Sequence, residues 1–207
     1  ERIANENGWT EVDGVLLDLG VSSPQLDDAG RGFSFLREGP LDMRMDRSSP
    51  LTAADLVNTE GEEALATVFR ELGEEPRARR IARAIVRRRE SKGWIETTTE
   101  LADVVAGAVG RSGPRHPATR VFQALRMAVN DELGELDRAL EGGMASLRSG
   151  GRFAVITFES LSDRKVKGSF SSHVGRMKSL QAGGEEWFGA EPRARAVTRR
   201  AVATGEV

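Results

Sequence analysis

Residues 12–35 read VDGVLLDLGVSSPQLDDAGRGFSF, and the change of composition within this stretch predicts the fold class. Residues 12–18 are rich in Val and Leu and predict a buried strand, which ends in Asp18. A segment rich in Gly, Ser and Pro follows, and it predicts a long loop up to residue 45. In open α/β sheets, ligands bind beyond the carboxyl ends of strands, in the loops that follow them. Asp18 is therefore a candidate site residue, and the alternative is that its carboxylate caps the next turn.

Helical patterns and a second apolar run follow this strand along the chain. Thr52 is expected to cap a helix, and Thr97 with Glu100 forms a capping box ahead of another. Residues 118–140 place apolar side chains at spacings of three and four, which predicts one long helix. A glycine turn and the apolar run FAVITF at 153–158 then predict a second, fully apolar strand. A helix followed by a turn and an apolar strand is half of a parallel α/β unit, so we expect an α/β fold.

Composition excludes several classes of protein. A length of 207 residues is that of one domain, or of one domain with an insertion. With 30 basic and 32 acidic side chains, the net charge of -2 excludes a globally basic nucleic-acid coat but not a local basic face. The chain has no Cys and only two His, which excludes thiol chemistry and does not favour a metal site. No apolar run reaches the ~18 residues of a membrane span, so we expect a cytoplasmic protein.

Arginines are concentrated between residues 77 and 89, which contain seven of them and no lysine. On a helix, Arg80, Arg83 and Arg87 fall on one side, opposite an apolar side. Such an arginine face can neutralise the phosphates of a nucleic acid. An ordinary solvated helix face is the alternative that these residues leave open.

Several blocks of the sequence resemble one protein family in their order and spacing. The blocks are LLDLGVSSPQLDDAGRGFSFLREGPLDMRMD (16–46), RIARAIVRRR (80–89), HPATRVFQALRMAVNDELGELDRAL (116–140) and GGRFAVITFESLSDRKVK (150–167). Together they resemble the bacterial 16S ribosomal RNA cytosine-N4 methyltransferases, known as the MraW family. The likeness extends over most of residues 10–167.

The resemblance implies a fold, a cofactor and a substrate. It implies a Rossmann-like class I methyltransferase core, formed by residues 1–46 and 116–207, with an inserted helical, RNA-recognising domain at 47–115. It further implies S-adenosylmethionine as methyl donor and the N4 amine of a cytidine in 16S RNA of the small ribosomal subunit as acceptor. By this resemblance Asp18 and Gln25 contact the cofactor, and Asp18 is also the candidate catalytic residue. Arg80, Arg83 and Arg87 are then expected to contact the RNA.

The sequence also departs from the family pattern. No glycine-rich strand-to-helix turn of the cofactor-binding kind is present, so we expect a core that is incomplete at its N-terminus and a chain that is a fragment of the enzyme. Glu159 and Ser162 stand where the family has His and Glu. Two other functions therefore stay open, namely an RNA-binding paralogue that has lost cofactor binding and a methyltransferase for another amine, such as one in a DNA base.

Overall fold

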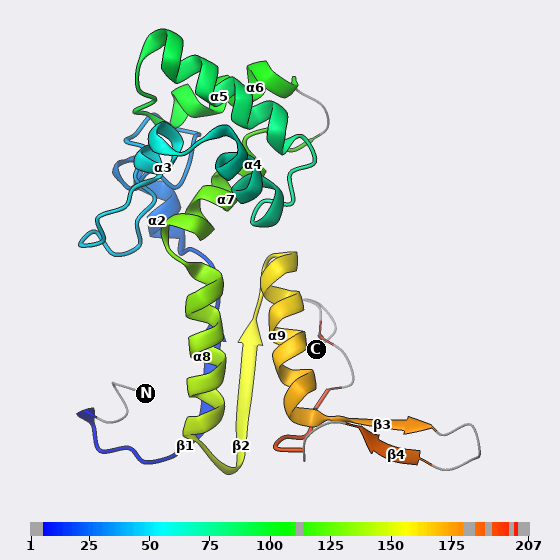
Figure 1. Cartoon of the computed structure of the whole chain (residues 1–207). Helices are drawn as coiled ribbons and strands as arrows, with labels where there is room; N and C mark the ends of the chain where they lie inside the picture. Colours follow the sequence, from blue (N-terminus) through cyan, green and yellow to red (C-terminus); the bar gives the residue numbers. More distant parts are fainter. Residues whose placement is uncertain (1–5, 111–113, 180–184, 189–191, 199–200, 203–207) are drawn as a thin grey trace. The chain divides into compact units, whose positions relative to one another are not determined.

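The structure is a computed structural model that describes residues 6–110, 114–179, 185–188, 192–198 and 201–202 (Figure 1). The chain divides into two compact units. We call residues 1–20 with 136–207 the sheet unit, and residues 21–135 the helical unit. The segments 21–46 and 116–135 thus lie in the helical unit, whereas the sequence assigned them to the methyltransferase core. The division of the chain by function stays a prediction.

The sheet unit is built on two parallel strands, β1 (Val12–Asp18) and β2 (Leu147–Ile156). Two helices, α8 (Glu132–Ser146) and α9 (Ser160–Val174), run alongside these strands (Figure 1). Their side chains form a small core with one face of the pair, and its members are Leu136, Leu140 and Val166 with Leu17, Leu19, Phe153, Val155 and Phe170. A Cβ atom at Gly143 would lie 2.6 Å from the Phe153 ring, so a glycine is needed where α8 approaches the strands. Farther along, β3 (Arg176–Ser179) and β4 (Glu185–Phe188) pair antiparallel.

The other face of the parallel pair is exposed. Successive side chains of a strand point to opposite faces, so Leu17 lies in the core while Leu16 and Asp18 lie on the far side. On that side Leu16 is 67% exposed and Ile156 is 45% exposed. Phe158, just after β2, is 75% exposed. The prediction of a buried strand over residues 12–18 is therefore wrong, because only one face of the pair is covered.

Helices make up most of the helical unit, and they share a single core. The helices are α2 (Ser23–Asp27), the 3-10 helix η1 (Ala29–Arg31), α3 (Ala53–Thr59), α4 (Glu62–Glu71), α5 (Ala78–Lys92), α6 (Thr98–Val109) and α7 (Thr119–Val129). Fully buried side chains from α4, α5, α6 and α7 meet in this core; among them are Leu65, Phe69, Ile81, Ile85, Leu101 and Leu125. The predicted caps are confirmed, because Thr52 accepts a hydrogen bond from the Asp55 amide and Thr97 accepts one from the Glu100 amide.

The predicted single helix over 118–140 is wrong. The chain forms α7 and α8 instead, and it breaks at Asn130 and Asp131, where Asp131 has a φ of 46°. The Asn130 side chain binds the backbone of Met43 and Met45 rather than lying along a continuous helix. An ion pair of Arg126 with Glu132, at 2.7 and 2.9 Å, spans the break.

These elements form a mixed α/β structure, so the predicted fold class is confirmed, and the parallel pair is consistent with a Rossmann-like methyltransferase core. Among the described residues, no helix is both long enough and apolar enough to cross a membrane.

Candidate functional site

Asp18 ends β1 with an exposed carboxylate. It lies opposite Ile156 in the parallel register, and one further backbone bond, from Leu19 N to Ile156 O at 3.1 Å, continues the pairing. Within the described part of the chain, the Asp18 carboxylate accepts no hydrogen bond, and residue 22 takes the N-cap position of the next helix. The alternative that Asp18 caps its own turn therefore lacks a contact to support it. The carboxylate is left as an acceptor for a ligand.

Gln25 has a defined place at the start of α2. Its side-chain oxygen accepts hydrogen bonds from the Ser22 amide at 2.9 Å and the Ser22 hydroxyl at 3.1 Å. This pairing fixes the turn that begins the helix, in the manner of a capping box. Because these bonds use only the oxygen, the amide nitrogen of Gln25 remains a donor that can meet an acceptor on a ligand. Asp18 belongs to the sheet unit and Gln25 to the helical unit.

The arginine face of α5 forms as the sequence predicted. Arg80, Arg83 and Arg87 are exposed, whereas Ile81 and Ile85 are fully buried on the other side of the helix. Glu62 of α4 pairs with Arg83 at 3.2 Å, so part of the charge at the centre of the face is neutralised. Surface pairs of this kind contribute little to stability, and a phosphate can compete for the guanidinium.

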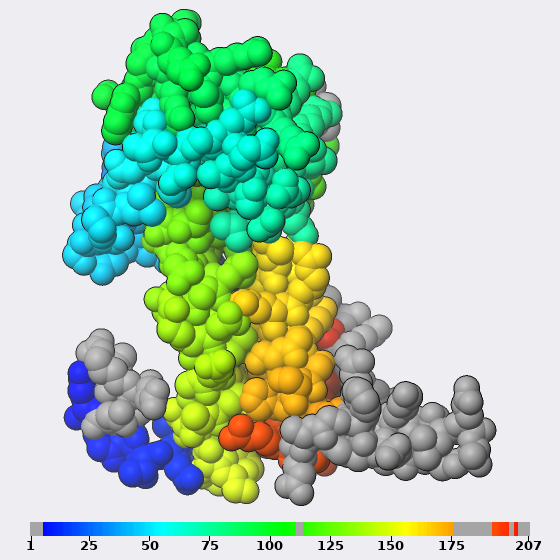
Figure 2. All heavy atoms as spheres, in the orientation of Figure 1, coloured from blue at the N-terminus to red at the C-terminus, as the bar shows by residue number. Residues whose placement is uncertain are grey.

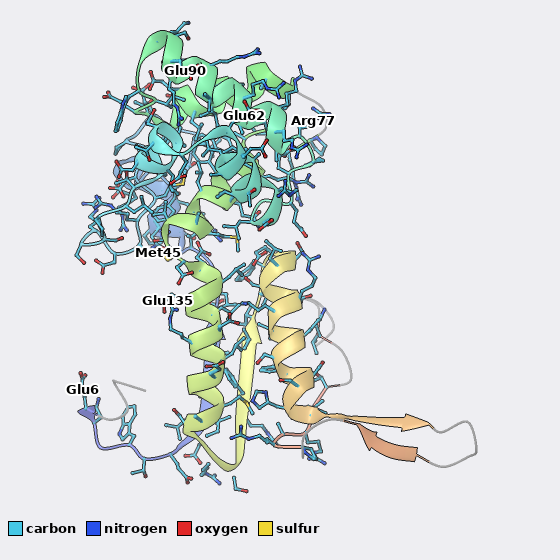
Figure 3. The ribbon with its side chains drawn as sticks, viewed as in Figure 1. Glu6, Met45, Glu62, Arg77, Glu90 and Glu135 are labelled. Carbon is cyan, nitrogen blue, oxygen red and sulfur yellow. The ribbon has the colours of Figure 1, made fainter. Side chains whose placement is uncertain are left out.

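The other arginines between residues 77 and 89 are of two kinds: some bond to neighbouring segments, and one is exposed. Arg77 donates to Val109 O, Arg88 pairs with Glu100, and Arg89 donates to Val57 O. These three side chains fasten α5 to neighbouring segments. Arg79 is also exposed, and it adds a further charge beside Arg80. Figure 3 labels Arg77, Glu62 and Glu90 on this part of the helical unit.

A second cluster, which the sequence did not single out, surrounds residues 42–49. Arg44 forms two bonds with the Asp42 carboxylate, at 2.8 and 2.9 Å, and these bonds hold the pKa of Asp42 below its usual value. Met43 is fully buried and has a φ of 61°, a backbone conformation that is rare for residues other than glycine. No local signal marks a positive φ at a methionine. The alternation of charged residues with Met in LDMRMD was the one available hint.

Glu159, which replaces a His of the family pattern, has a local structural role. Its carboxylate accepts hydrogen bonds from the backbone amides of Leu161 and Ser162, each at 2.7 Å, and so caps the N-terminus of α9. A negative charge at this end of a helix is favourable. Ser162 takes part through its backbone amide.

No metal centre is found in the described ranges, which contain no group of three or more His, Cys, Asp or Glu side chains able to hold an ion. His116 packs against the ring of Phe35, with 4.6 Å between ring centroids, and its Nδ1 accepts a hydrogen bond from the Ala118 amide. This histidine therefore has the packing role of a turn residue.

Comparisons with known proteins place the chain in a family. The sequence model of the MraW methylase family matches residues 1–207. A protein of Geobacter sulfurreducens named Ribosomal RNA small subunit methyltransferase H is 51% identical over 209 residues, which cover 100% of this chain and 67% of that protein. Proteins of the same name from Methylobacterium nodulans and Symbiobacterium thermophilum are 56% and 55% identical over 86% and 82% of this chain, and over 53% and 54% of their own lengths.

The chain thus spans between about half and two thirds of the length of these curated relatives. The match extends through both the sheet unit and the helical unit. The chain belongs to the MraW methylase family.

Proposed function

We propose that this chain is part of a methyltransferase that uses S-adenosylmethionine to methylate N4 of a cytidine in 16S RNA of the small ribosomal subunit. The observation that carries the proposal is the family match over the whole chain. It is supported by the exposed Asp18 carboxylate, which stands at a strand end and is free of partners among the described residues. With the small ribosomal subunit as substrate, we expect this activity in the cytoplasm. We keep residues 47–115 as the proposed RNA-recognising part.

The residues present fit the proposed cofactor chemically. S-adenosylmethionine carries an amine and ribose hydroxyls that donate to a carboxylate, and a carboxylate and ring nitrogens that accept from an amide. Asp18 offers the acceptor and Gln25 Nε2 offers the donor. When bound, the cofactor supplies a methyl group on a positively charged sulfur.

The target amine needs help from the protein, because its lone pair is delocalised into the cytosine ring. A carboxylate that accepts hydrogen bonds from N4–H favours the pyramidal form of the amine and helps it to lose a proton after methyl transfer. Asp18 can provide this acceptor. Holding the amine nitrogen in line with the methyl carbon contributes through orientation. The base must also be unstacked, and phosphate contacts to Arg80, Arg83 and Arg87 offset that cost.

We infer that cofactor binding needs the part of the relatives that this chain does not span. The parallel pair has one bare face, and Asp18 is on that face with the exposed Leu16. A cofactor held on one side only is expected to bind weakly. Calorimetry of the 207-residue chain with S-adenosylmethionine should detect no micromolar binding. Binding at micromolar affinity would contradict this inference.

A chimaera tests the activity itself. Residues 1–207 replace the matching segment of the Geobacter sulfurreducens relative, and methyl transfer to small ribosomal subunits and to duplex DNA is measured. We expect N4-methylcytidine in the RNA and no product in the DNA. Methylation of DNA alone would favour the alternative of another amine as acceptor.

An RNA-binding protein without catalytic activity is the second candidate. The observation that favours it is the exposed arginine face within a helical unit that has its own core, together with Glu159 in place of the family's His. In that case the chimaera would bind RNA but would transfer no methyl group. The parent relative, assayed in parallel, shows that the substrate and conditions are adequate.

A further inference from the structure

We infer that residues 42–49 form a rigid arm that presents Arg47 to one phosphate of the RNA. This inference rests on the proposed RNA substrate and adds a contact outside the arginine face of α5. The arm lies entirely in the helical unit, before α3, and its segment stands at the edge of that unit in Figure 2.

The arm begins with a strained residue that is held from several sides. Met43 has a φ of 61° and no exposed surface. Its amide donates to Arg31 O at 3.1 Å, and its carbonyl accepts from Asn130 Nδ2 at 2.8 Å. Strained backbone of this kind persists only where the surrounding structure over-determines it, and it is concentrated at functional sites.

Two further side chains fasten the arm from different elements. Asn130, at the end of α7, accepts a hydrogen bond from the Met45 amide at 2.7 Å, so both of its side-chain atoms hold the arm. Arg31 of η1 donates from Nη2 to the carbonyls of Arg44 at 2.8 Å and Met45 at 3.1 Å. Met45 is labelled in Figure 3. These bonds join segments 85 and 13 residues apart in the sequence, so they fix the arm to the body of the unit.

The side chain of Arg44 makes its hydrogen bonds within the arm. Besides its two bonds with Asp42, it donates from Nη1 to Arg47 O at 3.0 Å and Ser49 O at 2.6 Å. Its positive charge is balanced by the Asp42 carboxylate. Arg44 therefore shapes the arm and does not offer a guanidinium to a ligand.

Arg47, in contrast, has an exposed guanidinium at the tip. Asp46 forms the turn there, since its carboxylate accepts from the Ser48 amide at 2.8 Å and the Ser48 hydroxyl at 2.7 Å. Within the described residues, the one bond of the Arg47 side chain is a long one, 3.4 Å from Nη2 to Gly30 O. Most of its donors are left for a ligand, and arginine matches the geometry of a phosphate with two parallel bonds.

Within the helical unit, the arm contacts the segment next to α2. The Arg47 side chain bonds to Gly30 O of η1, and η1 directly follows α2, which carries Gln25, along the chain. A phosphate contact beside the predicted cofactor loop would fix the register of the RNA without reading its sequence. Because the arm is already ordered, little conformational freedom is lost when the contact forms.

The alternative is that the arm only packs and that Arg47 is an ordinary surface arginine. Binding of a single-stranded small-subunit RNA fragment to the 207-residue chain, measured over a range of salt concentrations, separates the two. The variant is Arg47→Ala, and the matched control is Arg70→Ala, an exposed arginine of α4 in the same unit. Asn130→Ala, which keeps Arg47 but loosens the arm, is the third protein.

We expect Arg47→Ala to weaken RNA binding by about 3- to 10-fold and to reduce the slope of log affinity against log salt by about 0.7 to 1, as the loss of one phosphate contact does. Arg70→Ala should bind as the unchanged chain does, and Asn130→Ala should weaken binding in the same direction as Arg47→Ala. If Arg47→Ala matches the unchanged chain in affinity and in the slope of log affinity against log salt, the proposed contact of Arg47 with a phosphate is wrong. The proposed function is then unaffected. If the unchanged chain shows no salt-dependent RNA binding, the proposed Arg47 contact and the proposed function are both wrong.

Discussion

Asp18 and Ile156 face each other at the ends of the two parallel strands, and both side chains are exposed. A carboxylate and an apolar side chain thus stand together on the bare face of the sheet unit. The core on the opposite face does not include Asp18, so changes at Asp18 should affect ligand chemistry and leave folding intact.

The first prediction concerns Asp18→Asn in the chimaera with the Geobacter sulfurreducens relative. An amide cannot accept a proton from the target amine, so methyl transfer to small ribosomal subunits should fall by at least about 100-fold, which is typical of the loss of a positioned acid or base. Single-turnover methylation measures the effect. In the 207-residue chain, the same change should leave the free energy of unfolding within about 0.5 kcal/mol, as expected at the surface.

Asp13→Asn is the matched control for this prediction. Asp13 lies on the same strand, is exposed, and pairs with Arg148 at the surface. It should retain nearly full activity, because such pairs contribute little. Equal losses in the two variants would mean that the strand, rather than the Asp18 carboxylate, is what the change disturbs.

The second prediction concerns the exposed apolar face. Leu16→Ser with Phe158→Ser removes large side chains that are 67% and 75% exposed. In the 207-residue chain, we expect less binding of a hydrophobic dye and less self-association, since exposed apolar patches promote both. The urea midpoint should change little, because these side chains lose little buried area.

Leu17→Ser provides the contrast, because this neighbouring side chain packs in the core of the sheet unit. It should lower the free energy of unfolding by about 2 to 4 kcal/mol through lost burial and a buried hydroxyl. If Leu16→Ser proved as destabilising as Leu17→Ser, the face would be covered in solution and the interpretation of a bare face would be wrong.

The third prediction concerns the arginine face of α5. Changing Arg80, Arg83 and Arg87 to Glu should weaken binding of single-stranded RNA by at least about 100-fold and flatten its dependence on salt, because several phosphate contacts are lost. Fluorescence anisotropy at several salt concentrations measures both quantities. Circular dichroism should show the same helix content, since none of the three side chains is buried.

The control for this prediction reverses three cations of the sheet unit, namely Arg152, Lys165 and Lys167, which changes the net charge by the same amount. If this control lost affinity to the same degree, net charge rather than the arginine face would explain the binding. If the slope of log affinity against log salt is unchanged in the α5 variant, the arginine face is an ordinary solvated surface.

Local sequence signals predicted the parts of the fold that local bonds determine. The capping boxes at Thr52 and Thr97 involve residues three apart, so their pattern is visible in the sequence. Asp18 was correctly placed at a strand end for the same reason, since a short apolar run with an acidic end is a local feature.

The features of the fold that could not be predicted from the sequence depend on bonds between distant segments. The break between α7 and α8 follows from Asn130, whose partners Met43 and Met45 are 87 and 85 residues away, while the apolar spacing of three and four continues through the break. The arm of residues 42–49 depends on the same bonds. The exposure of Leu16 was missed because the sequence of a strand does not show whether its second face is covered.

The last prediction concerns stability in acid. Hydrogen bonds from the Arg44 side chain hold the pKa of Asp42 below its ordinary value of 3.8, and Ser48 lowers the pKa of Asp46 in the same way. A carboxyl whose pKa is lower in the folded state binds protons more readily when unfolded, so it stabilises the fold above about pH 4. This stabilisation is lost as the pH falls from about 4 through the lower folded pKa of Asp42.

Asp42→Asn tests this link directly. The variant cannot form the charged pair, so its free energy of unfolding should be lower by about 1 to 3 kcal/mol at pH 7. The difference from the unchanged chain should shrink as the pH is lowered below 4, because protonation then removes the charge from Asp42 in the unchanged chain as well. Urea titrations at pH 7, 5, 4 and 3 measure the difference. A gap between the two proteins that is constant over this range would show that Asp42 acts through packing or neutral hydrogen bonds, and that its charge contributes nothing to holding the arm.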